Sequence, residues 1–175
     1  MGVSISSERL ATPASGTAPG PVDIRDELRK DHEVALTELE ALRLETDERR
    51  CFAQLRQVRR TWVIHALAEE TVVYRALEGA EAGQDSKTHA DERFIEHELV
   101  EGLFEKLSRS RPGTLEWNAR INVARELIAR HIESEHNDMF IRLGRYFESS
   151  KLREMGRRFE LARAKLRMLE EAKAA

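Results

Sequence analysis

Histidines interrupt the apolar stripes of four successive helical segments, and this feature constrains the fold of the 175-residue chain most strongly. From Val22 onward, apolar residues recur at alternating steps of three and four, which is the spacing of one face of an α-helix. His32, His65, His97 and His131 each occupy a stripe position where leucine or isoleucine is expected, at intervals of 33, 32 and 34 residues. A buried imidazole is unfavourable unless a partner satisfies it. Four of them at matching places therefore require a common explanation.

The segments that carry these stripes are separated by short breaks. Residues 1–21 are rich in Ser, Thr, Ala, Gly and Pro, a composition that predicts a disordered tail. Turn-forming residues predict breaks at residues 46–47, 79–83, 111–114 and 149–150. Short connections between long helices favour antiparallel neighbours. We therefore expect an all-α fold, an up-down-up-down four-helix bundle over residues 22–148 with an additional amphipathic helix over 149–175.

The four histidines can lie in one layer of such a bundle. At a rise of ~1.5 Å per residue, His32 lies ~21 Å before the first turn and His65 ~26 Å after it. The same estimate places His97 ~20 Å before the third turn and His131 ~26 Å after it. These depths agree within about one helical turn at each hairpin.

Two of the histidines are followed by a glutamate on the same helical face. Glu69 stands four residues after His65, and Glu135 four residues after His131. Side chains at this spacing point the same way, so one helix can offer a nitrogen and an oxygen to the same centre. Imidazole together with carboxylate suits Fe, Mn or Zn. Four imidazoles and two carboxylates are too many for one tetrahedral ion, but they would serve two ions bridged by the carboxylates.

The motifs around these residues resemble those of the hemerythrin-like HHE cation-binding family. The resemblance covers roughly residues 24–148 and is carried by Asp31-His32, HALAEE (65–70), EHEL (96–99) and HIESEH (131–136). It implies that His32, His65, His97 and His131 are terminal ligands and that Glu69 and Glu135 bridge two irons. It also implies a four-helix bundle and chemistry with O2, NO or peroxide. We therefore expect two iron ions (Fe2+/Fe3+) joined by an oxo or hydroxo bridge, a small diatomic or peroxide ligand, and no separate catalytic side chain.

Two positions depart from the pattern of the oxygen-carrying hemerythrins. Glu101 stands where they have a second histidine in the third helix, and His136 stands where they have an aspartate. Fewer histidines would leave one iron more open, which favours redox turnover over reversible oxygen carriage. Glu101 is either a seventh ligand, an outer hydrogen-bond acceptor, or a partly exposed helix residue.

The residues next to the expected ligands have simpler interpretations. Glu70 and His136 should point about 100° away from the preceding glutamates, so we expect solvation or hydrogen bonding to a ligand. Trp62 and Tyr74 are interpreted as apolar packing near the site. For Tyr74 the alternative is a hydroxyl that donates a hydrogen bond to a bound oxygen species.

Charge and hydropathy exclude several other classes of protein. The net charge of −3 gives no electrostatic case for nucleic-acid binding. No segment approaches the ~20 apolar residues of a membrane span. Cys51 is the only cysteine, which suits a reducing cytosol. We therefore expect a soluble cytoplasmic protein.

The last segment leaves more than one interpretation open. It is basic and amphipathic, and such a helix can bind a membrane surface or a partner. Its regular apolar stripe favours packing on its own bundle or homodimerisation instead. Two alternatives to the diiron hypothesis also stay open, a metal-free helical module that dimerises through this helix and a Zn or Mn bundle without a redox role.

Overall fold

The computed structural model describes residues 22–80 and 84–174, and these residues are helical apart from short connections. The elements are α1 (Ile24–Leu44), α2 (Glu48–Glu69), η1 (Glu70–Tyr74), α3 (Arg75–Ala80), α4 (Gln84–Ser108), α5 (Leu115–Ser134), η2 (Glu135–Met139), α6 (Phe140–Tyr146) and α7 (Ser149–Ala174), where η denotes a π-helical turn. The described residues contain no β-strand, so the all-α prediction is confirmed. The predicted tail at 1–21 and part of the predicted break at 79–83 lie outside the described residues.

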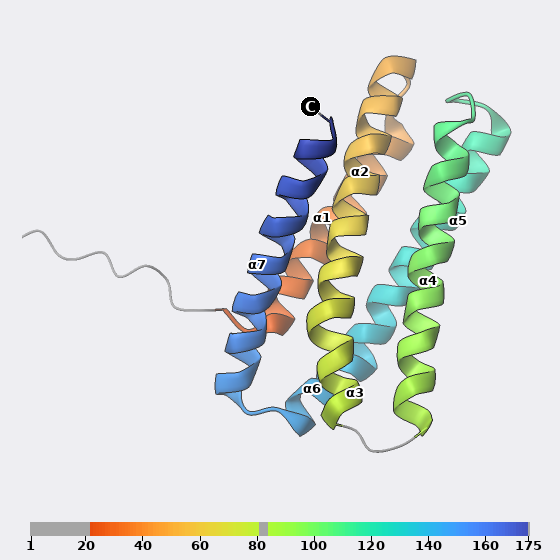
Figure 1. Cartoon of the computed structure of the whole chain (residues 1–175). Coiled ribbons are helices and arrows are strands. Elements are labelled where there is room, and N and C mark those ends of the chain that lie inside the picture. Colours follow the sequence, from red (N-terminus) through yellow and green to blue (C-terminus); the bar gives the residue numbers. More distant parts are fainter. Residues whose placement is uncertain (1–21, 81–83, 175) are drawn as a thin grey trace, which may run out of the picture.

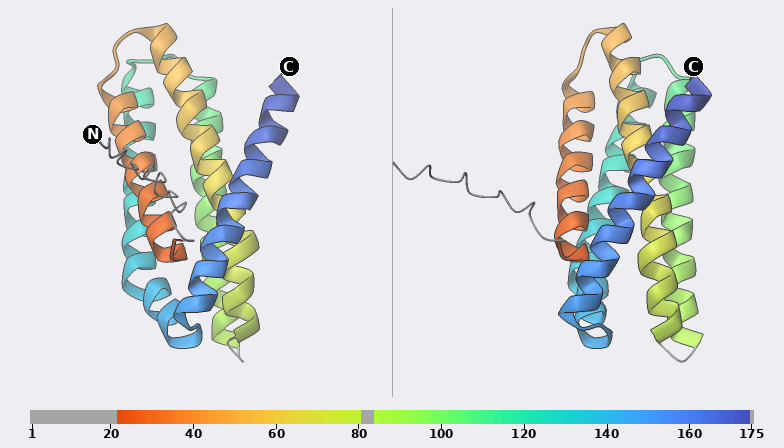
Figure 2. Two further views of the ribbon diagram at one scale, coloured as in Figure 1. Left: turned by 90° about the vertical axis from the view of Figure 1, so that its left-hand side faces the viewer. Right: turned by 60° about the vertical axis from the view of Figure 1, so that its left-hand side comes forward.

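The long helices lie side by side around a common core. α1 contacts α2 and α5, and α4 contacts the same two helices, so the contacts close a ring (Figure 1). The turn η1 and helix α3 continue α2 in one rod, and η2 and α6 continue α5 in another. Helix α7 packs outside this ring, against α1 and α2 (Figure 2). No helix within residues 22–80 and 84–174 has the length and hydropathy needed to cross a membrane.

Local capping residues explain where the helices begin. The side chains of Asp23, Asp47 and Thr114 each accept a hydrogen bond from a backbone N–H in the first turn of α1, α2 and α5, respectively. Such caps satisfy N–H groups that have no partner inside the helix. Gly113 precedes the last of these caps with φ 77°, a left-handed conformation that favours glycine. The predicted breaks at 46–47 and 111–114 therefore follow from local chemistry.

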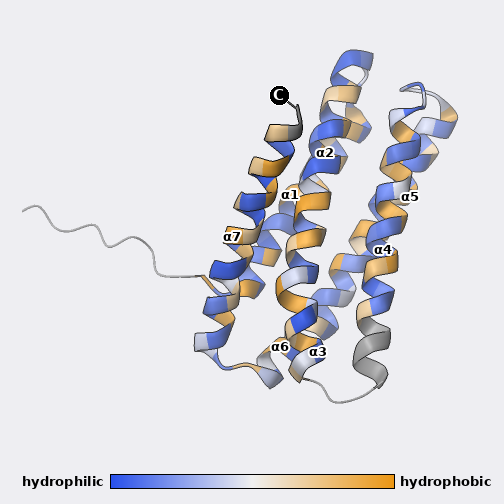
Figure 3. Cartoon of the chain, in the orientation of Figure 1, coloured by the Kyte–Doolittle hydropathy of each residue, from blue (hydrophilic) through white to orange (hydrophobic). Residues whose placement is uncertain are grey.

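Two apolar clusters lie at the two ends of the bundle. One contains buried residues of α1, α7 and the two π-helical regions, including Leu28, Val73 and Phe159. The other contains buried residues of α1, α2, α4 and α5, including Trp62 and Ile128. Along each helix, hydrophobic residues alternate with hydrophilic ones (Figure 3). The histidine of each stripe falls between the residues of these two clusters, which places a polar layer in the middle of the core.

A glycine of helix α7 lies directly against the backbone at the start of α1. Gly156 is buried, and a Cβ added there would overlap the carbonyl oxygen of Val22 and crowd the backbone nitrogen of Ile24. The C-terminal turns of α7 diverge from the bundle (Figure 2). Leu166 packs against the first apolar cluster, whereas Leu169, the last residue of the apolar stripe expected in this helix, is 49% exposed.

The substitution Gly156→Ala is expected to lower the free energy of unfolding by about 1–3 kcal/mol, because the neighbouring atoms are backbone and α7 must move away from α1. Chemical denaturation followed by circular dichroism measures this change. Gly102→Ala in α4 is the matched control, because a Cβ there meets nothing within 4 Å. Its expected effect is a small stabilisation of up to ~1 kcal/mol. Equal effects of the two substitutions would contradict the close approach of α7.

Candidate metal centre

The six side chains predicted as metal ligands lie together in the polar layer. Each is almost completely buried, with exposed fractions between 0 and 5%. The six are His32, His65, Glu69, His97, His131 and Glu135. Burial of so many ionisable groups in one place is unfavourable unless they satisfy one another or share a bound ion.

The six residues form two groups that share a glutamate. His32, His65, Glu69 and Glu135 place one ligand atom each within 4.8 Å of one another, and Glu69, His97 and His131 do the same. One Glu69 oxygen, Oε2, lies 3.5 Å from His65 Nε2 and 3.7 Å from His97 Nε2. Glu69 thus faces both groups.

Glu135 lies between the same two groups on the opposite rod. Its Oε2 is 3.1 Å from His32 Nε2, and its Oε1 is 3.1 Å from His131 Nε2. The two glutamates therefore each have one histidine from either group nearby, which is the arrangement expected of bridging carboxylates.

Several of these buried atoms are close together without hydrogen-bond geometry. His32 Nε2, His65 Nε2, Glu69 Oε1 and Glu135 Oε2 have no hydrogen-bond partner within the described part of the chain. Buried polar atoms are nearly always paired, so each such atom needs an explanation. In a metal site the lone pairs of the ligand atoms point toward a shared centre rather than toward each other. The donor set therefore fits the metal ions that the sequence implies.

The other ring nitrogen of each histidine faces a side chain of a neighbouring helix. His32 Nδ1 lies 3.1 Å from Nε2 of His136. His97 Nδ1 is 2.8 Å from a carboxylate oxygen of Glu70.

The remaining two histidines face carboxylates as well. His131 Nδ1 is 2.9 Å from Glu96 Oε2, and His65 Nδ1 is 3.5 Å from Asp31 Oδ2. Partners of this kind fix the orientation of a metal-binding imidazole and raise its basicity. Each of the four contacts joins a different pair of adjacent helices, so together they form a closed ring around the bundle.

The residues that flank the expected ligands have side-chain partners of their own. Glu70 forms a hydrogen bond with His97, and His136 forms one with His32. Of the two expectations for these residues, solvation or hydrogen bonding, the structure supports hydrogen bonding. Glu101 lies outside the two groups and pairs instead with Arg59 of α2, at 2.8 Å from Nε, with its side chain 33% exposed. The interpretation of Glu101 as a partly exposed helix residue is therefore the one that the structure supports.

Tyr74 packs in the first apolar cluster against Phe94, as the interpretation of apolar packing implies, but its hydroxyl also has polar partners. Its hydroxyl lies between the two glutamates, 3.1 Å from Glu69 Oε2 and 2.5 Å from Glu135 Oε1. Burial, together with the charge of Glu135, raises the pKa of Tyr74 well above 10. The hydroxyl therefore keeps its proton and donates a hydrogen bond to the carboxylates.

A π-helical turn explains how Tyr74 reaches this place. In a regular α-helix a residue five positions after Glu69 would point away from it, whereas the wider turn η1 brings the two side chains onto one face. A second π-helical turn, η2, begins at Glu135 itself. The helical period that places His65 and Glu69 on one face continues through Val72 to Ala76. Val72 is buried, but beyond it Leu77 is buried more completely than Ala76, so the inner face shifts by one residue.

Trp62 closes the layer from the side of the second apolar cluster. Its ring centre lies 5.4–5.7 Å from the ring centres of His65, His97 and His131. The tryptophan is 1% exposed. It therefore separates the polar layer from the rest of the core and restricts the positions of three histidines at once, as the interpretation of apolar packing implies.

In the metal-free chain the histidines of the layer differ in their protonation at neutral pH. Burial lowers the pKa values of His32 and His65 to about 4, so both are neutral near pH 7. Burial alone would also lower the pKa of His131, but the charge of Glu135 and hydrogen bonds to Glu135 and Glu96 raise it to about 10. Burial and the charge of Glu135 raise the pKa of Glu69 well above its usual range. The metal-free chain therefore holds a proton on His131 at neutral pH, and burial shifts Glu69 toward its protonated form.

Metal binding at pH 7 is expected to release at least one proton per chain, because ligands must be deprotonated and His131 holds a proton beforehand. The apparent affinity for metal should therefore rise as the pH rises and fall as the pH falls. Calorimetric titrations in two buffers with different enthalpies of ionisation measure the released protons. Binding heats that are independent of the buffer would contradict this assignment.

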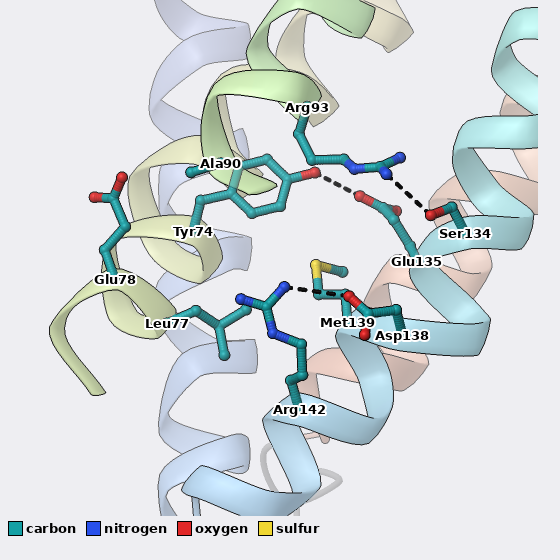
Figure 4. Close-up of a pocket in the computed structure, with 10 residues that line it drawn as sticks. All are labelled: Tyr74, Leu77, Glu78, Ala90, Arg93, Ser134, Glu135, Asp138, Met139 and Arg142. Carbon is teal, nitrogen blue, oxygen red and sulfur yellow. Dashed lines mark hydrogen bonds and ion pairs between the residues drawn. The ribbon is translucent and has the colours of Figure 1, made fainter. Parts of the chain in front are cut away.

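A small pocket adjoins the centre between the α2 rod, α4 and the α5 rod. It has a volume of about 20 Å³ and reaches Tyr74 and Glu135. In Figure 4 the tyrosine hydroxyl points toward Glu135, with Arg93 near Ser134 on one side and Arg142 near Asp138 on the other. The volume exceeds the 10–15 Å³ that one water molecule requires. The pocket therefore has room for a ligand of about that size.

Comparison with known families agrees with this geometry. No curated protein and no solved structure matched the chain significantly. A model of the hemerythrin HHE cation-binding domain matches residues 23–143, which is more than half of the chain and includes all six clustered side chains. The chain therefore belongs to the hemerythrin HHE cation-binding domain family.

Proposed function

We propose that the chain binds two iron ions and reacts with O2, peroxide or NO. The observation that carries this proposal is the pair of buried histidine and glutamate groups that share Glu69. In this proposal His32 and His65 would hold one ion, His97 and His131 would hold the other, and Glu69 and Glu135 would serve both. The surrounding helices act as an up-down-up-down four-helix bundle that supplies ligands from each of its rods.

The donor set supports iron but also suits manganese and zinc. Two histidines and two shared carboxylates give each ion fewer ligands than an octahedral site accepts, which leaves room for a small ligand. Bound iron would supply exchange between Fe2+ and Fe3+ with such a ligand. Membership in the HHE family and the accessible pocket favour this role over a purely structural site.

The chain's own residues would control how the ligand meets the ions. The buried layer excludes bulk water, and the outer partners of the histidines fix the imidazole rings. Tyr74 holds a proton on its hydroxyl oxygen beside Glu135 and the small pocket. The size of the pocket favours O2, NO or peroxide over a larger organic substrate. Glu101 does not supply the extra donor of the oxygen carriers, which favours redox turnover over oxygen carriage.

Elemental analysis of protein that was expressed with added iron and purified without chelators tests the first part of the proposal. The expected result is about two irons per chain, consistent with the two ligand groups. The iron-loaded protein should then change its visible absorption when O2, peroxide or NO is added. Two zinc or manganese ions without spectral change would replace the redox role with a structural one. Folded protein that refuses added ferrous iron would overturn the proposal and favour a metal-free interaction module.

A further inference from the structure

Helix α7 contacts the metal centre although it lies outside the region that matches the family. The family match ends at residue 143 and α7 begins at Ser149. Phe159 of α7 is fully buried, and its ring lies edge-on to His65 with a distance of 6.2 Å between ring centres. Phe159 lies outside the matched region, so this contact is one that α7 adds to the matched domain.

A buried arginine of α7 makes the polar part of this contact. Arg163 is 7% exposed, and its guanidinium lies 4.9 Å from the ring centre of Phe159. One of its nitrogens, Nη1, donates to Oδ1 of Asp31, and the other, Nη2, lies 3.2 Å from Glu27. The Nη2 atom also donates to Glu160 on α7 itself. A buried arginine with this many acidic partners is held in one orientation.

Asp31 connects this arginine to a metal ligand. While Oδ1 of Asp31 accepts from Arg163, Oδ2 lies 3.5 Å from Nδ1 of His65, close enough for an ion pair but without hydrogen-bond geometry. The corresponding partners of His32, His97 and His131 all lie within the bundle and are closer, at 2.8–3.1 Å. His65 is therefore the ligand whose outer partner has the longest contact and is itself held by a residue of α7.

We propose that Arg163 is a positioning residue of the metal centre, which holds Asp31 so that Asp31 orients His65. This proposal rests on the proposed binding of metal by His65. Helix α7 thereby becomes a functional part of the centre, and it acts on the ion held by His32 and His65 rather than on the ion held by His97 and His131. Glu27 and Glu160 accept hydrogen bonds from the same guanidinium.

The experiment compares Arg163→Met with Arg60→Met in the full-length, iron-loaded chain. Arg60 also joins the bundle to α7, at 2.8 Å from Glu171, but its ion pair is exposed and makes no contact with Asp31. Both variants therefore remove one arginine contact with α7. The measurement is the amount of iron that each variant retains at equilibrium as the chelator concentration is raised.

Arg163→Met is expected to lose one of the two ions at a chelator concentration roughly tenfold lower than the wild type requires. A roughly tenfold loss of metal affinity is the smallest effect typical of removing a hydrogen-bond partner of a metal ligand. Arg60→Met should retain both ions as the wild type does. The conservative variant Arg163→Lys should recover part of the affinity, since lysine can still pair with Asp31. Retention of both ions by Arg163→Met at wild-type chelator concentrations would overturn the proposal.

A double-mutant cycle with Asp31→Asn separates positioning from a general loss of structure. If Arg163 acts through Asp31, the effect of Arg163→Met on iron retention should disappear in the Asp31→Asn background. Additive effects of the two substitutions would also overturn the proposal. Should Arg163→Met fail to fold, as judged by circular dichroism, the same cycle is run with Arg163→Lys. Absence of iron in the wild type would instead contradict the proposed function, and this outcome is distinguished from failure of the Arg163 proposal because it does not depend on any variant.

Discussion

The substitution Glu69→Gln is expected to abolish binding of both metal ions and leave the metal-free fold about as stable as the wild type. Glu69 faces both ligand groups, so its loss affects both ions together. In the metal-free chain burial already favours the protonated, uncharged carboxyl, and glutamine has nearly the same shape. With free metal at a thousand times its dissociation constant, the wild type should gain about 4 kcal/mol of stability that the variant lacks.

Thermal unfolding with and without ferrous iron, together with elemental analysis, measures both effects. Glu101→Gln is the matched control, because Glu101 lies on the inner stripe of α4 but pairs with Arg59 outside the centre. This variant should bind metal and be stabilised by it as the wild type is. A Glu69→Gln protein that keeps its full metal content would exclude Glu69 as the shared ligand.

The substitution Trp62→Ala is expected to lower the free energy of unfolding of the metal-free chain by about 3–5 kcal/mol and also to weaken metal binding. The first effect follows from the cavity left by a tryptophan that is 1% exposed. The second follows because the indole packs against three of the histidines and separates them from the rest of the core. Without it these rings can turn, and water can enter the layer.

Trp117→Ala separates the two effects. Trp117 is 2% exposed in the same apolar cluster, and its ring contacts Phe52 rather than a ligand. The two variants should lose similar stability in denaturant, but only Trp62→Ala should lose metal to a chelator at equilibrium. Equal metal affinity in both variants would show that Trp62 contributes to the core alone. The milder substitutions by phenylalanine serve if either alanine variant fails to fold.

Much of the helical core could be predicted from the sequence because the information is local. The spacing of apolar residues defines the inner face of each helix, and it places His65 with Glu69 and His131 with Glu135 on one face without any knowledge of the tertiary structure. The caps at Asp47 and Thr114 likewise depend only on neighbouring residues.

The features that could not be predicted depend on contacts between distant parts of the chain or on irregular backbone. The π-helical turn after Glu69 moves Tyr74 onto the inner face, and helical periodicity has no signal for the added residue. Arg163 and Asp31 are 132 residues apart, and many arginines and acidic residues offer equivalent pairings in the sequence. The role of Glu96 as partner of His131 was missed for the same reason.

The ring of contacts between each histidine and a neighbouring helix has a kinetic consequence. A histidine that binds an ion as proposed could not turn away from it without breaking its contact with the next helix, and none of the six side chains of the layer is more than 5% exposed. Dissociation of metal should therefore wait for the helices to separate, so that its rate follows the rate of bundle opening. Even Trp117→Ala, which should leave the affinity of the folded state unchanged, would then shorten the lifetime of the bound metal. Residence time and affinity would be set by different parts of the same molecule.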